Sequence, residues 1–234
     1  MRVALASVND PIASGGLLHA LVGTILMVGG ALIISFPIGV LTALYLTEIR
    51  GSLTRPIKFL VQAMSGVPSI VAGLFILSAI VFPITKTPSG LMAGLALSIL
   101  MIPTIARTSE EVLLLIPPDL REAGIALGGT QWRTISQIVV PAAKSGLITA
   151  IILGVARVAG ETAPLVLVSG GGDAVNFNPT SGPMGSFPFY IWKSFTFGTN
   201  ESIARAWAGI FVLLVLIFVL FIAARLLGGD RNKK

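Results

Sequence analysis

The chain has 234 residues, of which 54% are hydrophobic and only 11% are charged. Soluble domains carry about 25% charged residues, so this composition excludes an ordinary water-soluble globule as well as a disordered chain. Cysteine is absent and histidine occurs once, which excludes a disulfide framework, a thiolate nucleophile and a histidine-based zinc site. The sequence therefore predicts a protein that lies mainly in lipid.

Long stretches without Asp, Glu, Lys or Arg mark the candidate membrane helices, because a helix needs about 20 apolar residues to cross the hydrocarbon. Five such stretches indicate an all-α polytopic membrane protein with one transmembrane domain over residues 18–226. In chain order, the predicted spans are 18–46, 61–82, 89–106, 145–169 and 206–226.

The basic residues are divided unequally between the two sides that these spans connect. Eleven of the 16 lie in 47–58, in 107–144 and from Arg225 to the end of the chain, whereas four lie on the other side and Arg157 lies within a span. Lys and Arg favour cytoplasmic loops, so the first three segments are predicted to face the cytoplasm, including the tail 227–234. The same distribution explains the net charge of +6 without a nucleic-acid partner.

This orientation places the N-terminal segment 1–17 outside, in the periplasm. The segment lacks the pattern of a signal peptide. Two explanations remain open. The preferred one is that a first helix, which would precede this sequence, is absent from it; the other is a five-span protein whose first helix inserts unaided.

The longest predicted cytoplasmic loop, 107–144, contains two short helices. The first begins near Leu120 and ends at Gly128, since glycine commonly terminates a helix. The second begins at Thr130 and is predicted to stop at Pro141. Such a pair either offers small side chains to a partner protein or rests on lipid headgroups.

The fourth predicted span contains a charged pair, Arg157 and Glu161, one helical turn apart. A charge at the bilayer centre costs at least about 2.5–3.5 kcal/mol on insertion scales and usually faces an aqueous path. Gly160 and Pro164 loosen the helix beside these charges, as in broken helices that line transport sites, and Thr162 adds a hydroxyl donor. A substrate path is the preferred interpretation; the alternative is a structural pair that locks helix packing.

The loop resembles the cytoplasmic EAA loop of permease subunits of bacterial ABC importers. The family pattern is E-A-A, three residues, G, nine residues, then I-x-L-P, and the spacing here matches throughout. Gly124 replaces the second Ala and Val140 replaces Leu. The residues that carry the match are Glu122, Ala123, Gly124, Gly128, Ile138 and Pro141.

Two further segments resemble phosphate-specific members of these permeases. Residues 157–165 are similar to the signature R-A-x-G-E-T-A-P-L, with Val158 in place of Ala. Residues 65–74, which include Gly66 and Pro68 as helix-breaking or packing positions, look like the G-[IV]-P-S-I-V stretch. The A-type permease subunit is the preferred match, and the C-type paralogue is the alternative.

The resemblance implies the type I (MetI-like) ABC importer permease fold without its usual first span, in the bacterial inner membrane. It implies transport of inorganic phosphate together with a second permease subunit, two ATPase subunits and a periplasmic phosphate-binding protein. ATP would be used by the ATPase, since this chain has no P-loop motif. We expect no catalytic residue, metal or bound cofactor in the chain itself.

In this interpretation the loop 107–144 couples the membrane helices to the ATPase, and the planar donor fork of Arg157 binds phosphate. Glu161 is hypothesised to accept a hydrogen bond from protonated phosphate and to repel sulfate. The simpler alternative is that Glu161 only holds Arg157 in place. For the whole chain, the alternatives are a permease for another oxyanion, such as sulfate or molybdate, and a truncated membrane scaffold that does not transport.

Overall fold

A computed structural model describes residues 16–49 and 51–228, and within these ranges the chain forms helices and loops without a β-strand. The predicted all-α class is thereby confirmed. The helical elements are α1 (Leu18–Leu44), η1 (Tyr45–Ile49), α2 (Thr54–Ser65), α3 (Ser69–Ile76), η2 (Leu77–Thr85), α4 (Gly90–Leu114), α5 (Pro118–Ala126), α6 (Gln131–Thr134), η3 (Ile135–Val139), α7 (Val140–Ala159), α8 (Ala163–Val168), α9 (Phe187–Phe197) and α10 (Asn200–Gly228).

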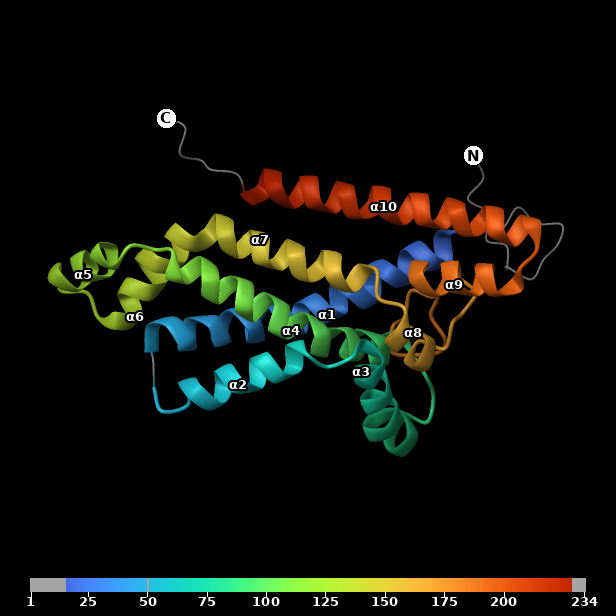
Figure 1. Cartoon of the computed structure of the whole chain (residues 1–234), viewed down its shortest axis with the longest axis horizontal. Helices are drawn as coiled ribbons and strands as arrows, with labels where there is room; N and C mark the ends of the chain where they lie inside the picture. The colour runs from blue at the N-terminus through green and yellow to red at the C-terminus, as the bar shows by residue number, and fades with distance from the viewer. Residues whose placement is uncertain (1–15, 50, 229–234) are drawn as a thin grey trace.

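Four long helices, α1, α4, α7 and α10, run along the long axis of the molecule (Figure 1). The short helices α5 and α6 form one end, and α8 and α9 lie toward the other. Four helical stretches of the described chain are long and apolar enough to cross a membrane: Leu18–Ile49, Gly90–Leu114, Gln131–Ala159 and Asn200–Ile222. A fifth crossing is obtained if one bent pair of helices is counted as a span.

That bent pair replaces the straight span predicted over 61–82. The helices Thr54–Ser65 and Ser69–Thr85 meet at 102°. Gly66 ends α2, and Pro68 precedes α3 with an extended backbone (φ −58°, ψ 136°). Proline has no N–H to continue the hydrogen-bond ladder of a helix, so the chain turns here although its apolar character continues.

The fourth span also differs from the prediction at both ends. The helix does not stop at Pro141 but continues from Gln131 to Ala159, through the wide turns of η3. Pro141 lies in the first turn of α7, and the π-helical turn before it accommodates a residue without an N–H. At the other end α7 stops at Ala159, ten residues short of the predicted boundary, and α8 follows as a separate short helix.

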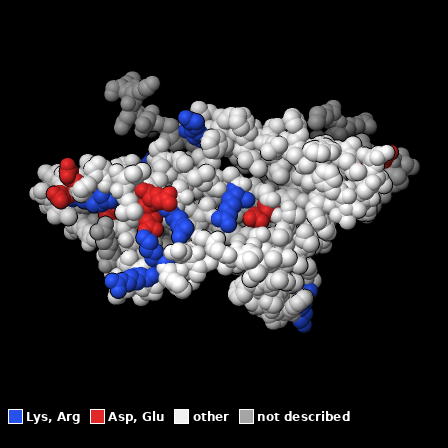
Figure 2. All heavy atoms as spheres, in the orientation of Figure 1, with Lys and Arg blue, Asp and Glu red and all other residues white. Residues whose placement is uncertain are grey.

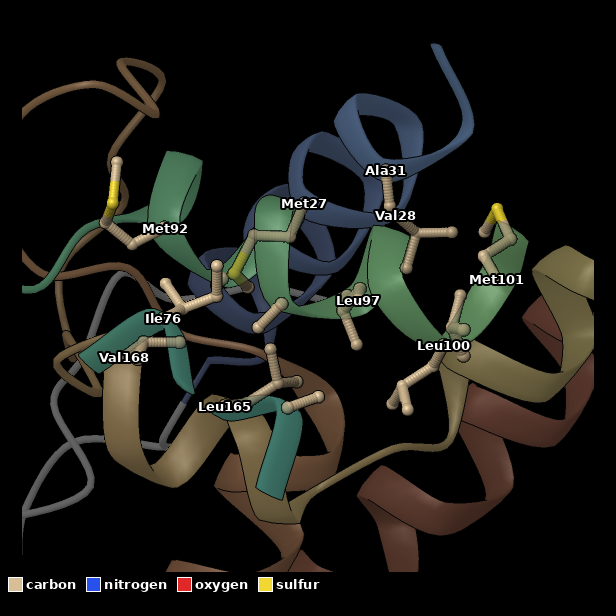
Figure 3. Close-up of a cluster of buried hydrophobic side chains, with 14 of the residues drawn as sticks. Met27, Val28, Ala31, Ile76, Met92, Leu97, Leu100, Met101, Leu165 and Val168 are labelled. Atoms are coloured by element: carbon tan, nitrogen blue, oxygen red, sulfur yellow. The ribbon is translucent and has the colours of Figure 1, made fainter. Parts of the chain in front are cut away.

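The core lies where α1 and α4 meet α3 and α8. Figure 3 shows Met27 and Leu97 gathered with Ile76, Leu165 and Val168, and all five are buried. Lipid is as apolar as these side chains, so close van der Waals fit rather than exclusion of water holds membrane helices together. Gly39 permits that fit: a Cβ there would lie 2.8 Å from Ile105 Cγ2 of α4.

Candidate functional site

Charged side chains gather at the α5 and α6 end of the face shown in Figure 2. Most of the remaining face carries no charged side chain, as expected of a surface in lipid, apart from a patch of adjacent basic and acidic groups near mid-length and isolated charges at its edges (Figure 2). The molecule therefore presents two candidate sites: a surface at the α5 end and a charged site at the level of the membrane.

The turn residues of the sequence fix how α5 ends. Gly128 has a left-handed backbone (φ +82°), and its N–H donates to the Ile125 carbonyl at 2.9 Å. The N–H of Gly129 donates to the Gly124 carbonyl at 3.1 Å, which completes a Schellman motif. Thr130 then caps α6, because its Oγ1 accepts a hydrogen bond from the backbone N–H of Arg133 at 3.3 Å.

The α5–α6 pair is held closed by Gly124. A Cβ at Gly124 would lie 2.7 Å from Thr134 Cγ2 and 2.8 Å from Ile138 Cδ1. Two predicted coupling positions, Gly124 and Ile138, therefore meet across the pair. Glu122, Ala123 and Gly128 are exposed on the outer side of α5, and Pro141 is exposed at the start of α7.

Arg121 fastens α5 to the ends of two long helices, a role that the sequence did not reveal. Its Nη2 and Nε atoms donate to the Glu48 carboxylate at 2.8 and 3.0 Å. The guanidinium also donates to the carbonyls of Leu113 at 2.9 Å and Ile116 at 2.7 Å, at the end of α4. The Glu48 side chain is only 6% exposed. These hydrogen bonds from the guanidinium to Glu48 raise the pKa of Arg121 further above its ordinary value.

A hollow of about 550 Å³ lies between this ion pair and α6. Its lining includes Glu48, Arg121 and Gln131, and the Gln131 side chain donates to the Glu48 backbone carbonyl at 2.8 Å. Large apolar side chains stand exposed around the same end, with Leu127 at 87%. Exposed apolar groups next to a charged end mark a protein-interaction surface.

At the membrane level Arg157 is exposed, and its Nη1 donates to Thr104 Oγ1 of α4 at 2.9 Å. Within the described residues no ion pair joins Arg157 to Glu161, so they do not form the structural pair that was the alternative interpretation, and they do not share one helical face. The reason is that α7 ends at Ala159, and the Glu161 N–H bonds the Val158 carbonyl in a tighter turn. Glu161 and Thr162 are half-buried in the connection that follows.

The two segments that resemble phosphate permeases lie side by side in space. Pro164 lies in the first turn of α8, and its Cα would be 2.7 Å from a Cβ at Gly73 of α3. Gly160 caps α7 with open space around it, and Gly66 and Pro68 form the bend that brings α3 here. No group of three or more His, Cys, Asp or Glu residues in the described ranges is arranged to hold a metal ion.

Residues 35–232 match the family model of the binding-protein-dependent transport system inner membrane component. The chain belongs to this family. It is 38% identical to the phosphate transport system permease protein PstA 1 of Mycobacterium tuberculosis (strain CDC 1551 / Oshkosh), over 92% of this chain and 71% of that protein. It is 35% identical to the PstA protein of Pasteurella multocida, over 100% of this chain and 83% of the relative.

Among solved structures, the chain resembles one from inward-facing conformations of the MetNI methionine ABC transporter. The TM-score is 0.72 with 20% identity, and the likeness covers 91% of this chain and 93% of the other. This confirms the predicted MetI-like permease fold. Membership of the family makes the chain a multi-pass membrane subunit of a transport system rather than an enzyme, and implies an ATPase and a substrate-binding protein as partners.

Proposed function

We propose that this chain is the permease subunit of an ATP-driven importer of inorganic phosphate in a bacterial inner membrane. Its partners would be a second permease subunit, two ATPase subunits and a periplasmic phosphate-binding protein. The observation that carries the proposal is the similarity of nearly the whole chain to proteins named as phosphate transport system permeases.

Arg157 is the proposed phosphate-binding residue. A single hydrogen bond to Thr104 orients its guanidinium, and in the described part of the chain its other donors have no partner. A planar fork of donors suits an oxyanion, and an arginine at membrane depth usually faces an aqueous path. Thr162 would add a hydroxyl donor, and Glu161 would accept a hydrogen bond from the O–H group that phosphate retains and sulfate lacks.

The α5 end would face the cytoplasm, since the basic segments 51–58 and 107–144 lie toward that end (Figure 1). Closure of the ATPase pair would press on the exposed side of α5. The hydrogen bonds of Arg121 would carry that movement to Glu48 and to the end of α4, and the contacts of Gly124 would carry it into the helix Gln131–Ala159. The membrane helices would then reorient and open the phosphate path to the other side.

Uptake of radiolabelled phosphate tests the proposal in a strain that lacks its own phosphate permeases and expresses this chain with its partner subunits. Arg157→Ala should abolish uptake, and Arg157→Lys should reduce it because an ammonium group cannot bind an oxyanion through a planar fork. The matched control is Arg55→Lys, an exposed position in α2. Uptake of sulfate or molybdate instead of phosphate would overturn the substrate assignment, and a normal rate with Arg157→Lys would overturn the forked binding.

Glu161→Gln tests selectivity in the same cells. If the carboxylate rejects sulfate, this variant should transport phosphate but lose discrimination against a sulfate competitor. Glu161→Asp, which keeps the charge, is the control. Unchanged discrimination in the Gln variant would leave Glu161 with a structural role only.

A further inference from the structure

An apolar groove lies beside the long helix α10, away from Arg157 and from the α5 end. The groove has a volume of about 290 Å³ and lies between α1, α7 and α10, with Gly29, Val155 and Leu216 among its lining residues. Phe221 also lines a second hollow of about 470 Å³, which extends along α10 to Arg225. The two hollows share Phe221 and follow each other along α10 toward the α5 end, and together they are called the track.

The length of this track matches one leaflet of a bilayer. Leu216 and Arg225 are nine residues apart on α10, which corresponds to about 13.5 Å along a helix. Half of the hydrocarbon core is about 15 Å thick. An acyl chain whose headgroup lies beside Arg225 would therefore end near the bottom of the apolar groove.

The charge at the outer end of the track is positive. Arg225 is exposed, and in the described part of the chain no carboxylate forms an ion pair with it. The sequence continues with Arg231, Lys233 and Lys234 against one acid, Asp230. Basic residues next to a membrane helix strengthen binding to anionic lipid about fivefold each.

We infer that the track binds one anionic phospholipid, with an acyl chain between α1, α7 and α10 and its phosphate on Arg225. A helix of a partner subunit is the competing occupant. The lipid fits better because the track combines an apolar length of one leaflet with a cationic end.

The test is native mass spectrometry of the chain purified with its partner subunits, titrated with phosphatidylglycerol and with phosphatidylcholine of the same acyl chains. The wild-type chain should bind phosphatidylglycerol at least about fivefold more tightly. Gly29→Leu should reduce retention of both lipids, because a Cβ at Gly29 meets open space and the new side chain would fill the groove. Arg225→Gln should reduce the preference for the anionic headgroup about fivefold while leaving binding of both lipids.

Gly30→Leu is the matched control, since its Cβ also meets open space but Gly30 does not line the groove. It should bind lipid as the wild type does, and millimolar inorganic phosphate should not displace the lipid. Three results would overturn the inference: equal retention by Gly29→Leu and wild type, equal affinity of the wild type for the two headgroups, or loss of a partner subunit in Gly29→Leu with lipid retention unchanged. The experiment measures lipid binding and not phosphate uptake. A failure of the lipid inference can therefore be distinguished from a failure of the transport proposal.

Discussion

Arg121 holds the α5 end together although it belongs to none of the sequence motifs that were recognised. It pairs with a buried carboxylate and also satisfies two carbonyls at the end of α4, so it replaces water for several polar groups at once. Lysine would not serve here, because a single ammonium cannot reach carboxylate and carbonyls in the same planar arrangement.

We expect Arg121→Gln to destabilise the protein by about 3 kcal/mol, the lower end of the cost of leaving one partner of a buried ion pair. The thermal unfolding midpoint of the purified protein in detergent measures this. The control is Lys58→Gln, which breaks the ion pair between Lys58 and Glu110. The lysine is 63% exposed, so loss of this pair should cost at most about 1 kcal/mol. The double variant Arg121→Gln/Glu48→Gln should recover part of the loss; equal midpoints for Arg121→Gln and Lys58→Gln would contradict the expectation.

Substitution by alanine should change the stability of the protein differently at Gly73 and at Gly160. A Cβ at Gly73 would lie 2.7 Å from the backbone Cα of Pro164, so α3 and α8 must move apart. We expect Gly73→Ala to cost about 1–3 kcal/mol, as overpacking does. Gly160→Ala should be near neutral, since Gly160 has open space and a negative φ of −96°. Equal unfolding midpoints for the two variants would show that α3 and α8 are not in close contact.

At the scale of elements, the end of α5 is set by backbone conformation. Gly128 has φ +82° and open space around it. An alanine there would clash with no neighbour, and its only cost would be about 1–2 kcal/mol for a left-handed backbone. We expect Gly128→Ala to reduce ATP hydrolysis that depends on the assembled transporter, because α6 would start at a different angle. Gly128→Asn should restore most of it, since asparagine tolerates this conformation. If the Asn and Ala variants are equally impaired, the left-handed turn is not the cause.

Hydropathy located the lipid-facing stretches of α1, α4 and α10, but it did not locate the ends or directions of helices. The helix α4 continues to Leu114, past the predicted 106, because charged residues leave the hydrocarbon without leaving the helix. The bend of 102° at Gly66–Pro68 was not predicted, although both residues were singled out as helix-breaking or packing positions, because no charged residue interrupts 59–85 and the whole stretch was counted as one span. Hydropathy indicates whether a segment prefers lipid or water, whereas the direction of a helix depends on its backbone hydrogen bonds.

The sites show the same division. The residue spacing of the loop 107–144 identified Gly124 and Ile138 as candidate coupling positions. They pack against each other because local turns determine the position of both. The placement of Arg157 and Glu161 on one helical face was inferred from their spacing, and it fails because the helix ends at Ala159. Arg121 and Glu48 are 73 residues apart, a separation at which a single sequence carries no pairing signal.

For the whole molecule, the absence of cysteine gives a direct test of orientation. We expect Leu127→Cys, at the α5 end, to react with a membrane-impermeant maleimide only after cells are permeabilised. Phe177→Cys, in the loop between α8 and α9 and 73% exposed, should react in intact spheroplasts. The cysteine-free parent is the blank. The reverse labelling pattern would invert the proposed topology.

The ion pair between Arg121 and Glu48 also has a consequence for biosynthesis. Glu48 leaves the ribosome 73 residues before its partner, which corresponds to about 4–15 s at common rates of translation. During that interval Glu48 in η1 carries an unneutralised carboxylate, and the carbonyls at the end of α4, once made, have no guanidinium until Arg121 follows. The α5 end is therefore completed late, when more than half of the chain has been made, and a nascent chain released before residue 121 cannot form it.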